Sequence, residues 1–385
     1  MKELNSVHNT NSAQNGEHAN DPPELDLDTV EIDPGSLAKR ITSDTFDRWY
    51  QQQKFAQNIR DGKHYFNGPG RPKPANKISP SSLLQCHRKI TYRQLNAPEE
   101  SSDPNGIFWT GSMFEEDVIL PFLEELFRDQ NTYVTNSIWI DVRIDETTLP
   151  LRIKGVTDPV LVNSEGTPIL PTEVKTKRSI DHIEEPNRHH KAQAYAYMYG
   201  LTEKFDIPID QILLIYGSRD TLEIKTFLVE FDPTYWSNTV LSWAKRHVQY
   251  RTFNLLPPAE PEQDWECQYC SYRHRCGRSD RLYKDIGVTG LLPMFSEYPK
   301  EKLRDYLEFH DGAKLTPTLG FKFPDLAKEF GVYDWRCFGC GNSFDWTSIE
   351  YDSELSRGPR CPDCHEGFLR GPDPTDQAPH SGEEL

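Results

Sequence analysis

The chain has 385 residues, 60 acidic against 43 Lys and Arg residues, a formal net charge of −17 and eight cysteines. This length predicts roughly two domains of about 100–200 residues plus tails. Its longest apolar runs are far shorter than the ~20 residues of a transmembrane helix, and its first residues lack the apolar stretch of a signal peptide. We therefore expect a cytoplasmic protein with no membrane partner.

The charge is unevenly distributed along the chain. Residues 1–36 carry a net −7 and residues 371–385 a net −4 in aromatic-poor sequence, so we expect both tails to be disordered. Residues 41–96 carry a net +7. Bases attract phosphates and aromatic rings stack on nucleobases, so the negative total does not exclude nucleic acid. The alternative is a basic amphipathic helix with Trp49 and Phe55 in the core. The aromatic residues interleaved with these bases are Phe46, Trp49, Tyr50, Phe55, Tyr65, Phe66 and Tyr92.

A helix is predicted from Gly111 to about Arg128, with Ile119, Phe122, Leu123, Leu126 and Phe127 as its apolar stripe. Glu115 lies in its first turn and is a candidate metal ligand, with Glu116 as the close competitor.

A β-hairpin follows. Residues 151–162 are predicted as one strand and residues 169–177 as the return strand. Side chains alternate between the faces of a strand, so Glu173 and Lys175 share a face, and Asp158 lies opposite them. Two carboxylates can hold Mg²⁺ or Mn²⁺, and a neighbouring lysine can orient the attacking water and neutralise charge on phosphorus. The alternative is an ordinary surface salt bridge.

Residues 188–200 are predicted as a helix that ends with Gly200 at the C′ position. His189, Gln193 and Tyr197 recur every four residues and share a face suited to a nucleic-acid strand. The alternative places the tyrosines in the core and Gln193 as a satisfied buried amide.

Two further strands, over residues 211–216 and 222–231, and a helix over residues 234–252 complete the expected domain. Near its end come Cys267, Cys270 and Cys276, and Cys86 lies 180 residues upstream. A shared metal centre would clip the two ends of one folded unit together. His274 is the alternative fourth ligand, and spacing alone does not choose between zinc and an iron–sulfur cluster.

The C-terminal part is expected to hold a helical connector over residues 281–330, with one helix at about residues 299–309, and a zinc ribbon over residues 331–370. Two C-x₂-C pairs, 20 residues apart, supply four thiolates for tetrahedral Zn²⁺; they are Cys337, Cys340, Cys361 and Cys364. Two disulfides are the alternative, disfavoured without a secretory signal. The ribbon binds DNA or a partner protein in this interpretation.

These motifs, in this order, resemble the RecB-type branch of the PD-(D/E)XK nucleases. The closest subgroup has a four-iron four-sulfur cluster and includes CRISPR-associated RecB-like exonucleases and the nuclease domain of AddB-type recombination proteins. The matching motifs are ISPSSLLQCHRKITYR with Cys86, Gly155-x₂-Asp158, Glu173-x-Lys175, Gln193-x₃-Tyr197, and Cys267, Cys270 and Cys276. Many relatives have a histidine four residues after the first-motif glycine, where this chain has Glu115.

The resemblance implies an α/β fold with a restriction-endonuclease-like mixed sheet flanked by helices, here over residues 37–280, with a small C-terminal zinc ribbon added. It implies Mg²⁺ or Mn²⁺ at Asp158 and Glu173, with Glu115 assisting, and a 4Fe–4S cluster on Cys86, Cys267, Cys270 and Cys276. Lys175 then assists the water, and Gln193 and Tyr197 position the strand.

The expected function is that of a metal-dependent DNA nuclease, an exonuclease in DNA processing, repair or CRISPR adaptation. Its partners would be DNA, single-stranded or with free ends, and a helicase or other DNA-processing proteins. The alternative is a non-catalytic nucleic-acid-binding or adaptor protein that recognises DNA ends.

Overall fold

The computed structural model describes residues 34–60, 73–128, 131–145, 148–279, 283, 287–352 and 357–377. The chain divides into two compact units, Met1–Asn67 and Gly68–Leu385. Among the described helices, none combines the length and apolarity that a bilayer crossing requires. Most of the two tails expected to be disordered, residues 1–33 and 378–385, lies outside the described residues, as do Tyr65 and Phe66.

The described part of the first unit consists of two helices, α1 (Pro34–Arg40) and α2 (Ser43–Arg60). No side chain of α1 is buried. Trp49 and Phe55 of α2 are both exposed, so neither belongs to a core.

The second unit contains a five-stranded mixed sheet in the order β2-β5-β6-β7-β8. Strands β6 and β7 are parallel, and the other neighbours are antiparallel. A second, three-stranded sheet has the order β1-β4-β3. The strands of the first sheet are β2 (Tyr133–Thr135), β5 (Val160–Val162), β6 (Pro168–Lys177), β7 (Gln211–Ser218) and β8 (Ile224–Glu230); those of the second are β1 (Lys77–Ile78), β3 (Trp139–Ile144) and β4 (Leu151–Val156).

The single strand predicted over residues 151–162 is therefore two strands in two sheets. Pro159 lies at the break and has no amide hydrogen to donate to a ladder. The chain leaves β4 at Val156 and enters β5 at Val160, so Asp158 lies in the crossing between the sheets.

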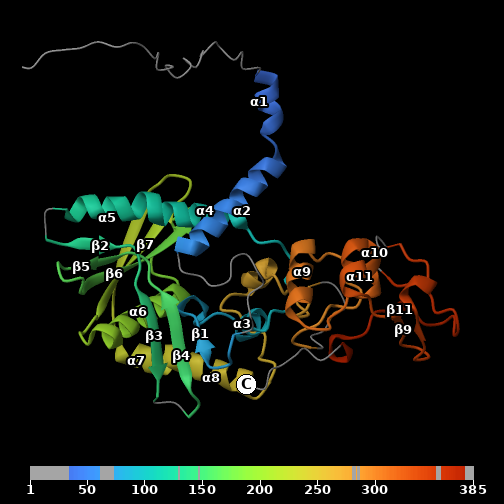
Figure 1. Ribbon diagram of the computed structural model, residues 1–385. Coiled ribbons are helices and arrows are strands. Elements are labelled where there is room, and N and C mark those ends of the chain that lie inside the picture. Colours follow the sequence, from blue (N-terminus) through green and yellow to red (C-terminus); the bar gives the residue numbers. More distant parts are fainter. Residues whose placement is uncertain are drawn as a thin grey trace, which may run out of the picture. The chain divides into compact units, whose positions relative to one another are not determined.

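Helices cover both faces of the five-stranded sheet (Figure 1): α4 (Asn105–Met113) and α5 (Leu120–Phe127) on one side, and α6 (Arg188–Phe205) on the other. A π-helical turn, Phe114–Ile119, joins α4 to α5. In the predicted stripe, Ile119 and Leu123 are buried, whereas Phe122 and Leu126 are exposed.

Helix α6 continues beyond Gly200, where the sequence predicted its end, and stops before Asp206, which has a left-handed φ of 55°. Gly200 serves packing instead. A Cβ at this position would lie 2.7 Å from Cδ1 of Ile140, so only glycine lets α6 approach β3 this closely.

The helix expected over residues 234–252 is present as α7 (Pro233–Tyr235), a π-helical turn (Trp236–Leu241) and α8 (Ser242–Thr252). Trp236 stacks on Tyr199 of α6 with ring centroids 4.9 Å apart. Trp243 of α8 stacks on His87 of α3 (His87–Gln94) at 4.4 Å, which connects the first cysteine region to the main core. Short 3₁₀ turns span Pro80–Ser82 and Asp264–Tyr269.

The connector contains the predicted helix as α9 (Lys300–Phe309), and also α10 (Pro317–Lys322) and α11 (Pro324–Phe330), which were not predicted. It has its own apolar core, which includes Leu291, Leu303, Leu319 and Leu326.

A small sheet in the order β10-β9-β11 follows. Its strands are β9 (Trp335–Cys337), β10 (Ser343–Phe344) and β11 (Leu369–Arg370), with 3₁₀ turns at Trp346–Ser348 and Pro374–Asp376. Residues 371–377, expected to be part of a disordered tail, are packed. The buried side chain of Gln377 donates to the carbonyl of Leu291 and accepts from its amide.

Candidate active site and cysteine metal centres

The centre of the candidate active site lies on β6, which carries Glu173 and Lys175 on one face, as predicted. Glu173 is fully buried, and its Oε1 forms an ion pair with Lys175 Nζ. Its Oε2 has no hydrogen-bond partner among the described residues. A buried carboxylate oxygen without a partner is costly, and a bound cation is the simplest group that would satisfy it.

Asp158 reaches this centre from the crossing between the sheets. Its Oδ2 accepts a 2.7 Å hydrogen bond from the amide of Val174, between the two β6 side chains. Gly155 lets β4 pack closely against the turn at Pro80, because a Cβ there would lie 2.7 Å from Cδ of Pro80. The Gly155-x₂-Asp158 pattern is thus explained by one close contact and one anchoring hydrogen bond.

Glu115 comes from the π-helical turn between α4 and α5, on the side of the sheet opposite α6 (Figure 1). The preceding residue, Phe114, packs its ring against Gly217 of β7, where any Cβ would overlap the ring. The electrostatic environment of Glu115 is dominated, after burial, by Asp158 and Glu173. The structure therefore favours Glu115 over Glu116 as the third carboxylate, and π turns are frequent at functional sites.

Burial and mutual repulsion favour protonated carboxyl groups at this site. Burial and then Asp158 raise the pKa of Glu173 to about 8. Burial and then the two other carboxylates raise the pKa of Glu115 to about 8, and burial also raises the pKa of Asp158. Burial opposes the charge on Lys175, but Glu173 and Asp158 outweigh it and raise the pKa of the lysine.

Such a set of carboxylates fits a divalent cation, which would replace the protons and relieve the repulsion. The oxygen atoms of Asp158, Glu173 and Glu115 are not all within 4.8 Å of one another, so the three carboxylates are neighbours without forming a compact set of metal ligands. In the part of the chain that the structure describes, the one group of three or more ligand atoms all within 4.8 Å of one another is the C-terminal cysteine group.

Gln193 and Tyr197 lie one turn apart on α6, and both are buried. Gln193 Nε2 donates to the Tyr197 hydroxyl at 3.0 Å. Burial, followed by Glu173 and Asp158, holds the pKa of Tyr197 well above its ordinary value. The pair thus lies within electrostatic reach of the carboxylates, while Tyr197 also belongs to the main apolar core and Gln193 is a hydrogen-bonded buried amide, as the alternative reading of this helix expected.

Two features beside the site were not predicted. Lys177 lies on the same face of β6 as Lys175, and burial followed by Lys175 lowers its pKa. The buried His190 shares a 2.8 Å hydrogen bond with the hydroxyl of Tyr216, the residue opposite Lys175 on β7. The alternation of side chains along β6 could have predicted that Lys177 lies beside Lys175. The contact between His190 and Tyr216 could not be predicted in this way, because the two residues are far apart in the sequence.

The first cysteine group comes together as predicted. Its four members, Cys86, Cys267, Cys270 and Cys276, all line one solvent-connected cavity. The ring of His274 instead packs against Phe295 at 4.8 Å, which favours Cys86 as the fourth ligand. The bases Lys89, Arg273 and Arg278 also line this cavity.

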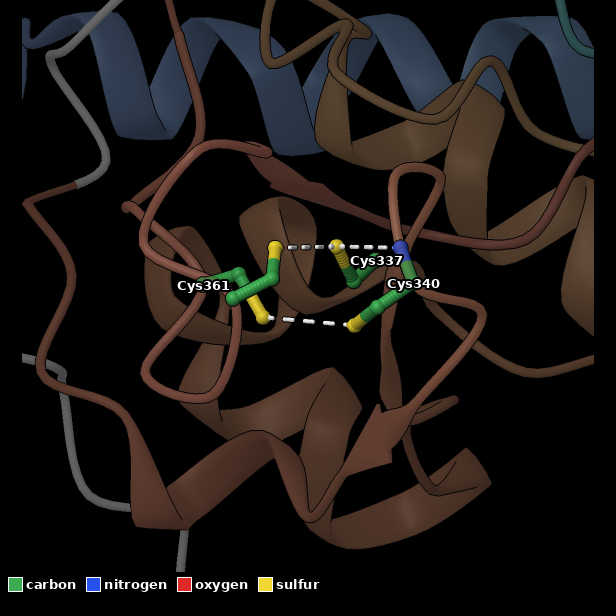
Figure 2. Close-up of side chains that lie close together, drawn as sticks. Cys337, Cys340 and Cys361 are labelled. Carbon is green, nitrogen blue, oxygen red and sulfur yellow. Dashed lines mark hydrogen bonds between the residues drawn. The ribbon is translucent and has the colours of Figure 1, made fainter.

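The second cysteine group is tighter (Figure 2). The four free thiols lie within 4.8 Å of one another, and two Sγ–Sγ pairs, Cys337–Cys364 and Cys340–Cys361, are each 3.7 Å apart. A tetrahedron with Zn–S bonds of about 2.3 Å has edges of about 3.8 Å, so the geometry fits one tetrahedral metal ion. The amides of Cys340 and Gly339 donate to Cys337 Sγ and lower the pKa of this thiol to about 6, which favours the metal-binding thiolate.

A mixed sheet flanked by helices, with buried carboxylates and a lysine at its centre, is the arrangement that the sequence predicted for a metal-dependent nuclease. The chain belongs to the PD-(D/E)XK nuclease superfamily, which it matches over residues 44–277. Among solved structures it is similar to "Crystal structure of SSO0001" at 18% identity and a TM-score of 0.36, covering 59% of this chain and 93% of that one. No curated protein matches the chain.

Proposed function

We propose that this chain is a Mg²⁺- or Mn²⁺-dependent deoxyribonuclease, an exonuclease that acts on single-stranded DNA or on free DNA ends. The observation that carries the proposal is the fully buried Glu173, whose Oε2 lacks a partner while Oε1 pairs with Lys175. A purely binding protein has no need of such an arrangement, because a buried carboxylate oxygen without a partner destabilises the fold.

The residues divide the chemistry between them. Asp158, Glu173 and Glu115 would hold the divalent ion, which supplies a water of lowered pKa and an anchor for a phosphate oxygen when bound. Glu173 and Asp158 raise the pKa of Lys175, which favours its protonated form. As a cation, Lys175 would orient the water and stabilise negative charge at the phosphate.

Gln193 and Tyr197 hold the strand in this mechanism. The hydroxyl of Tyr197 accepts from Gln193, so its own proton remains available for a phosphate oxygen. Its pKa, well above the ordinary value, keeps that proton in place at neutral pH.

The cysteine groups complete the proposal. The four thiols of the first group line one cavity but do not all lie within 4.8 Å of one another, so they are too far apart for one ion, which supports a multi-iron cluster. In the second group, the Sγ–Sγ distances of 3.7 Å support a single zinc ion. Anaerobically purified protein should be brown and contain iron and acid-labile sulfide besides zinc. Colourless protein with zinc alone would contradict the cluster. The setting in repair or CRISPR adaptation, with a helicase as partner, follows from the family resemblance.

The test is Lys175→Ala in the full chain, assayed on labelled single- and double-stranded DNA with Mg²⁺ or Mn²⁺. Cleavage should fall by at least about 10²-fold while DNA affinity stays within a few-fold, because the lysine acts mainly in the transition state. Lys225→Ala, on β8 of the same sheet, is the matched control and should cleave normally. Cleavage retained in Lys175→Ala, or absent from the wild type with both metals, would reject the proposal.

A further inference from the structure

The small C-terminal sheet presents an exposed face that the catalytic site does not use. In the antiparallel pair β9–β11, Arg336 is opposite Arg370 and Cys337 is opposite Leu369. Cys337 and Leu369 are buried on the inner side. Because side chains alternate along a strand, the two arginines lie on the outer side.

Two phenylalanines continue this outer side one step beyond the metal ligand. Phe338 follows Cys337 and Phe368 precedes Leu369, and the two rings are 45% and 42% exposed. Gly367 fixes the geometry behind them, because a Cβ at this position would lie 2.8 Å from Cys337 Sγ. The close packing around the four thiols thus places both rings directly beside the cysteine group.

Each ring carries two guanidinium groups, so the sheet gathers four arginines around two aromatic side chains. From guanidinium carbon to ring centroid, the distances are 3.4 Å for Arg370 and 5.8 Å for Arg336 over Phe338, and 5.4 Å for Arg357 and 5.7 Å for Arg360 over Phe368. We call Arg336, Phe338, Arg357, Arg360, Phe368 and Arg370 the ribbon face.

Carboxylates also reach this face, at its Phe338 end. Asp376 pairs with Arg336 at 2.7 Å and Asp373 with Arg370 at 3.1 Å. The Arg336–Asp376 pair is exposed, and exposed pairs contribute little free energy and exchange readily for another anion, whereas Asp373 is half-buried and its pair with Arg370 is the more persistent of the two. At the Phe368 end, Arg360 donates to the carbonyl of His365 at 3.4 Å, which leaves its charge uncompensated by that contact.

We propose that the ribbon face binds single-stranded nucleic acid, with bases stacked on Phe338 and Phe368 and phosphates held by the arginines. Exposed aromatic rings stack on bases of any sequence. A guanidinium group can donate two parallel hydrogen bonds to the oxygens of one phosphate. The charge of the face complements a phosphodiester backbone. The proposal rests on the proposed function only in the choice of a nucleic acid over another polyanion.

The test uses full-length protein without added Mg²⁺ and a fluorescein-labelled oligothymidylate of about 20 nucleotides, followed by anisotropy. A double variant, Phe338→Ala with Phe368→Ala, should bind at least about tenfold more weakly, because two stacking platforms are removed. The same variant should bind an abasic oligomer of equal length as the wild type does, because that probe has no bases to stack. Phe338→Tyr should retain the affinity of the wild type.

The arginines are tested by salt dependence. Arg357→Ala with Arg360→Ala should reduce the slope of log K against log[salt] by about 1.4 on both probes, about 0.7 for each phosphate that is no longer neutralised. The control variant, Phe253→Ala with Arg143→Ala, removes an exposed ring and an exposed base outside the ribbon face. It should change neither the affinity for oligothymidylate nor the salt slope. Zinc content of one ion per chain in every variant verifies that the ribbon is folded.

Unchanged affinity of the phenylalanine variant for oligothymidylate would overturn the proposal. An equal loss on the abasic probe and on an acidic peptide would overturn it too, because that result indicates a general polyanion or protein-binding surface. These outcomes are independent of catalysis. A ribbon variant that keeps its affinity yet cleaves DNA refutes only the ribbon face, and retained cleavage in Lys175→Ala refutes only the proposed function.

Discussion

The burial of Glu173 predicts that the protein without a divalent ion loses stability as the pH rises. Its carboxyl group has a pKa of about 8 in the folded chain against an ordinary value of 4.5. The folded state therefore binds a proton that the unfolded state has already released above pH 4.5. The stabilisation is complete below about pH 4.5 and is lost progressively as the pH rises through 8. The difference between the two pKa values corresponds to a change of at most about 5 kcal/mol in the free energy of unfolding.

Replacing the ionisable group should remove this dependence. In Glu173→Gln the amide stays neutral at all pH values, so the free energy of unfolding should fall less steeply between pH 5 and pH 8. At pH 8 the variant should be more stable than the wild type by on the order of 2 kcal/mol. This value is below the limit because Lys175 loses its ion-pair partner. For a chain of this size, such a difference raises Tm by several degrees.

The assay is urea unfolding at pH 5, 6, 7 and 8, in buffers from which Mg²⁺ and Mn²⁺ are omitted. Chelators are avoided, because they would also remove any metal that the C-terminal cysteines bind. Added Mg²⁺ at about 100 times its Kd should stabilise the wild type by about 2.7 kcal/mol and the variant by far less. Glu203→Gln, an exposed change on α6, is the matched control and should follow the wild type. A variant that is less stable than the wild type at pH 8 without Mg²⁺, or equally pH-dependent, would refute the reasoning.

Three individual contacts lead to further predictions. Gly217→Ala would push a Cβ into the ring of Phe114 and displace the neighbouring carboxylate of Glu115. We therefore expect the free energy of unfolding to fall by about 1–3 kcal/mol and cleavage to fall at least about tenfold. A smaller residue at position 114 should restore stability, and a fully active, stable Gly217→Ala would contradict this packing. Tyr197→Phe leaves Gln193 Nε2 without its acceptor and should lower kcat more than it changes KM, with a stability cost of about 1–3 kcal/mol; an unchanged kcat would exclude the hydroxyl from the site. Cys361→Ser should lower the zinc content from one ion to none and leave iron unchanged, as measured by elemental analysis, whereas simultaneous depletion of both metals would show that the two cysteine groups depend on each other.

The chemistry of the site was predictable from local patterns. Strand alternation alone places Glu173 and Lys175 on one face, and helix periodicity places Gln193 one turn before Tyr197. The two C-x₂-C pairs predicted the four-sulfur group, because such spacing lets each knuckle turn around one ion. Within each of these patterns, and within each C-x₂-C pair, the residues are only a few positions apart, so short-range geometry is sufficient to predict them.

Other features depend on contacts between distant segments. Nothing local distinguishes Glu115 from Glu116; the π turn and the packing of Phe114 against Gly217 decide which carboxylate faces the site. Gly200 resembles a helix terminus in sequence, yet it is the position where β3 touches α6. In both places a residue far away along the chain imposes the outcome, and local propensity has no information about it.

The ribbon face makes the same distinction most clearly. In sequence, the few arginines of the C-terminal region are scattered among more numerous acids and give little indication of a nucleic-acid surface. The sequence determined the four thiols and hence the metal-held turns. Only the pairing of β9 with β11 decided that Arg336 and Arg370 lie opposite each other, with two exposed rings beside them. The physical reason is that metal-ligand spacing is encoded within each knuckle, whereas the composition of a surface depends on the strand register that brings separate knuckles together.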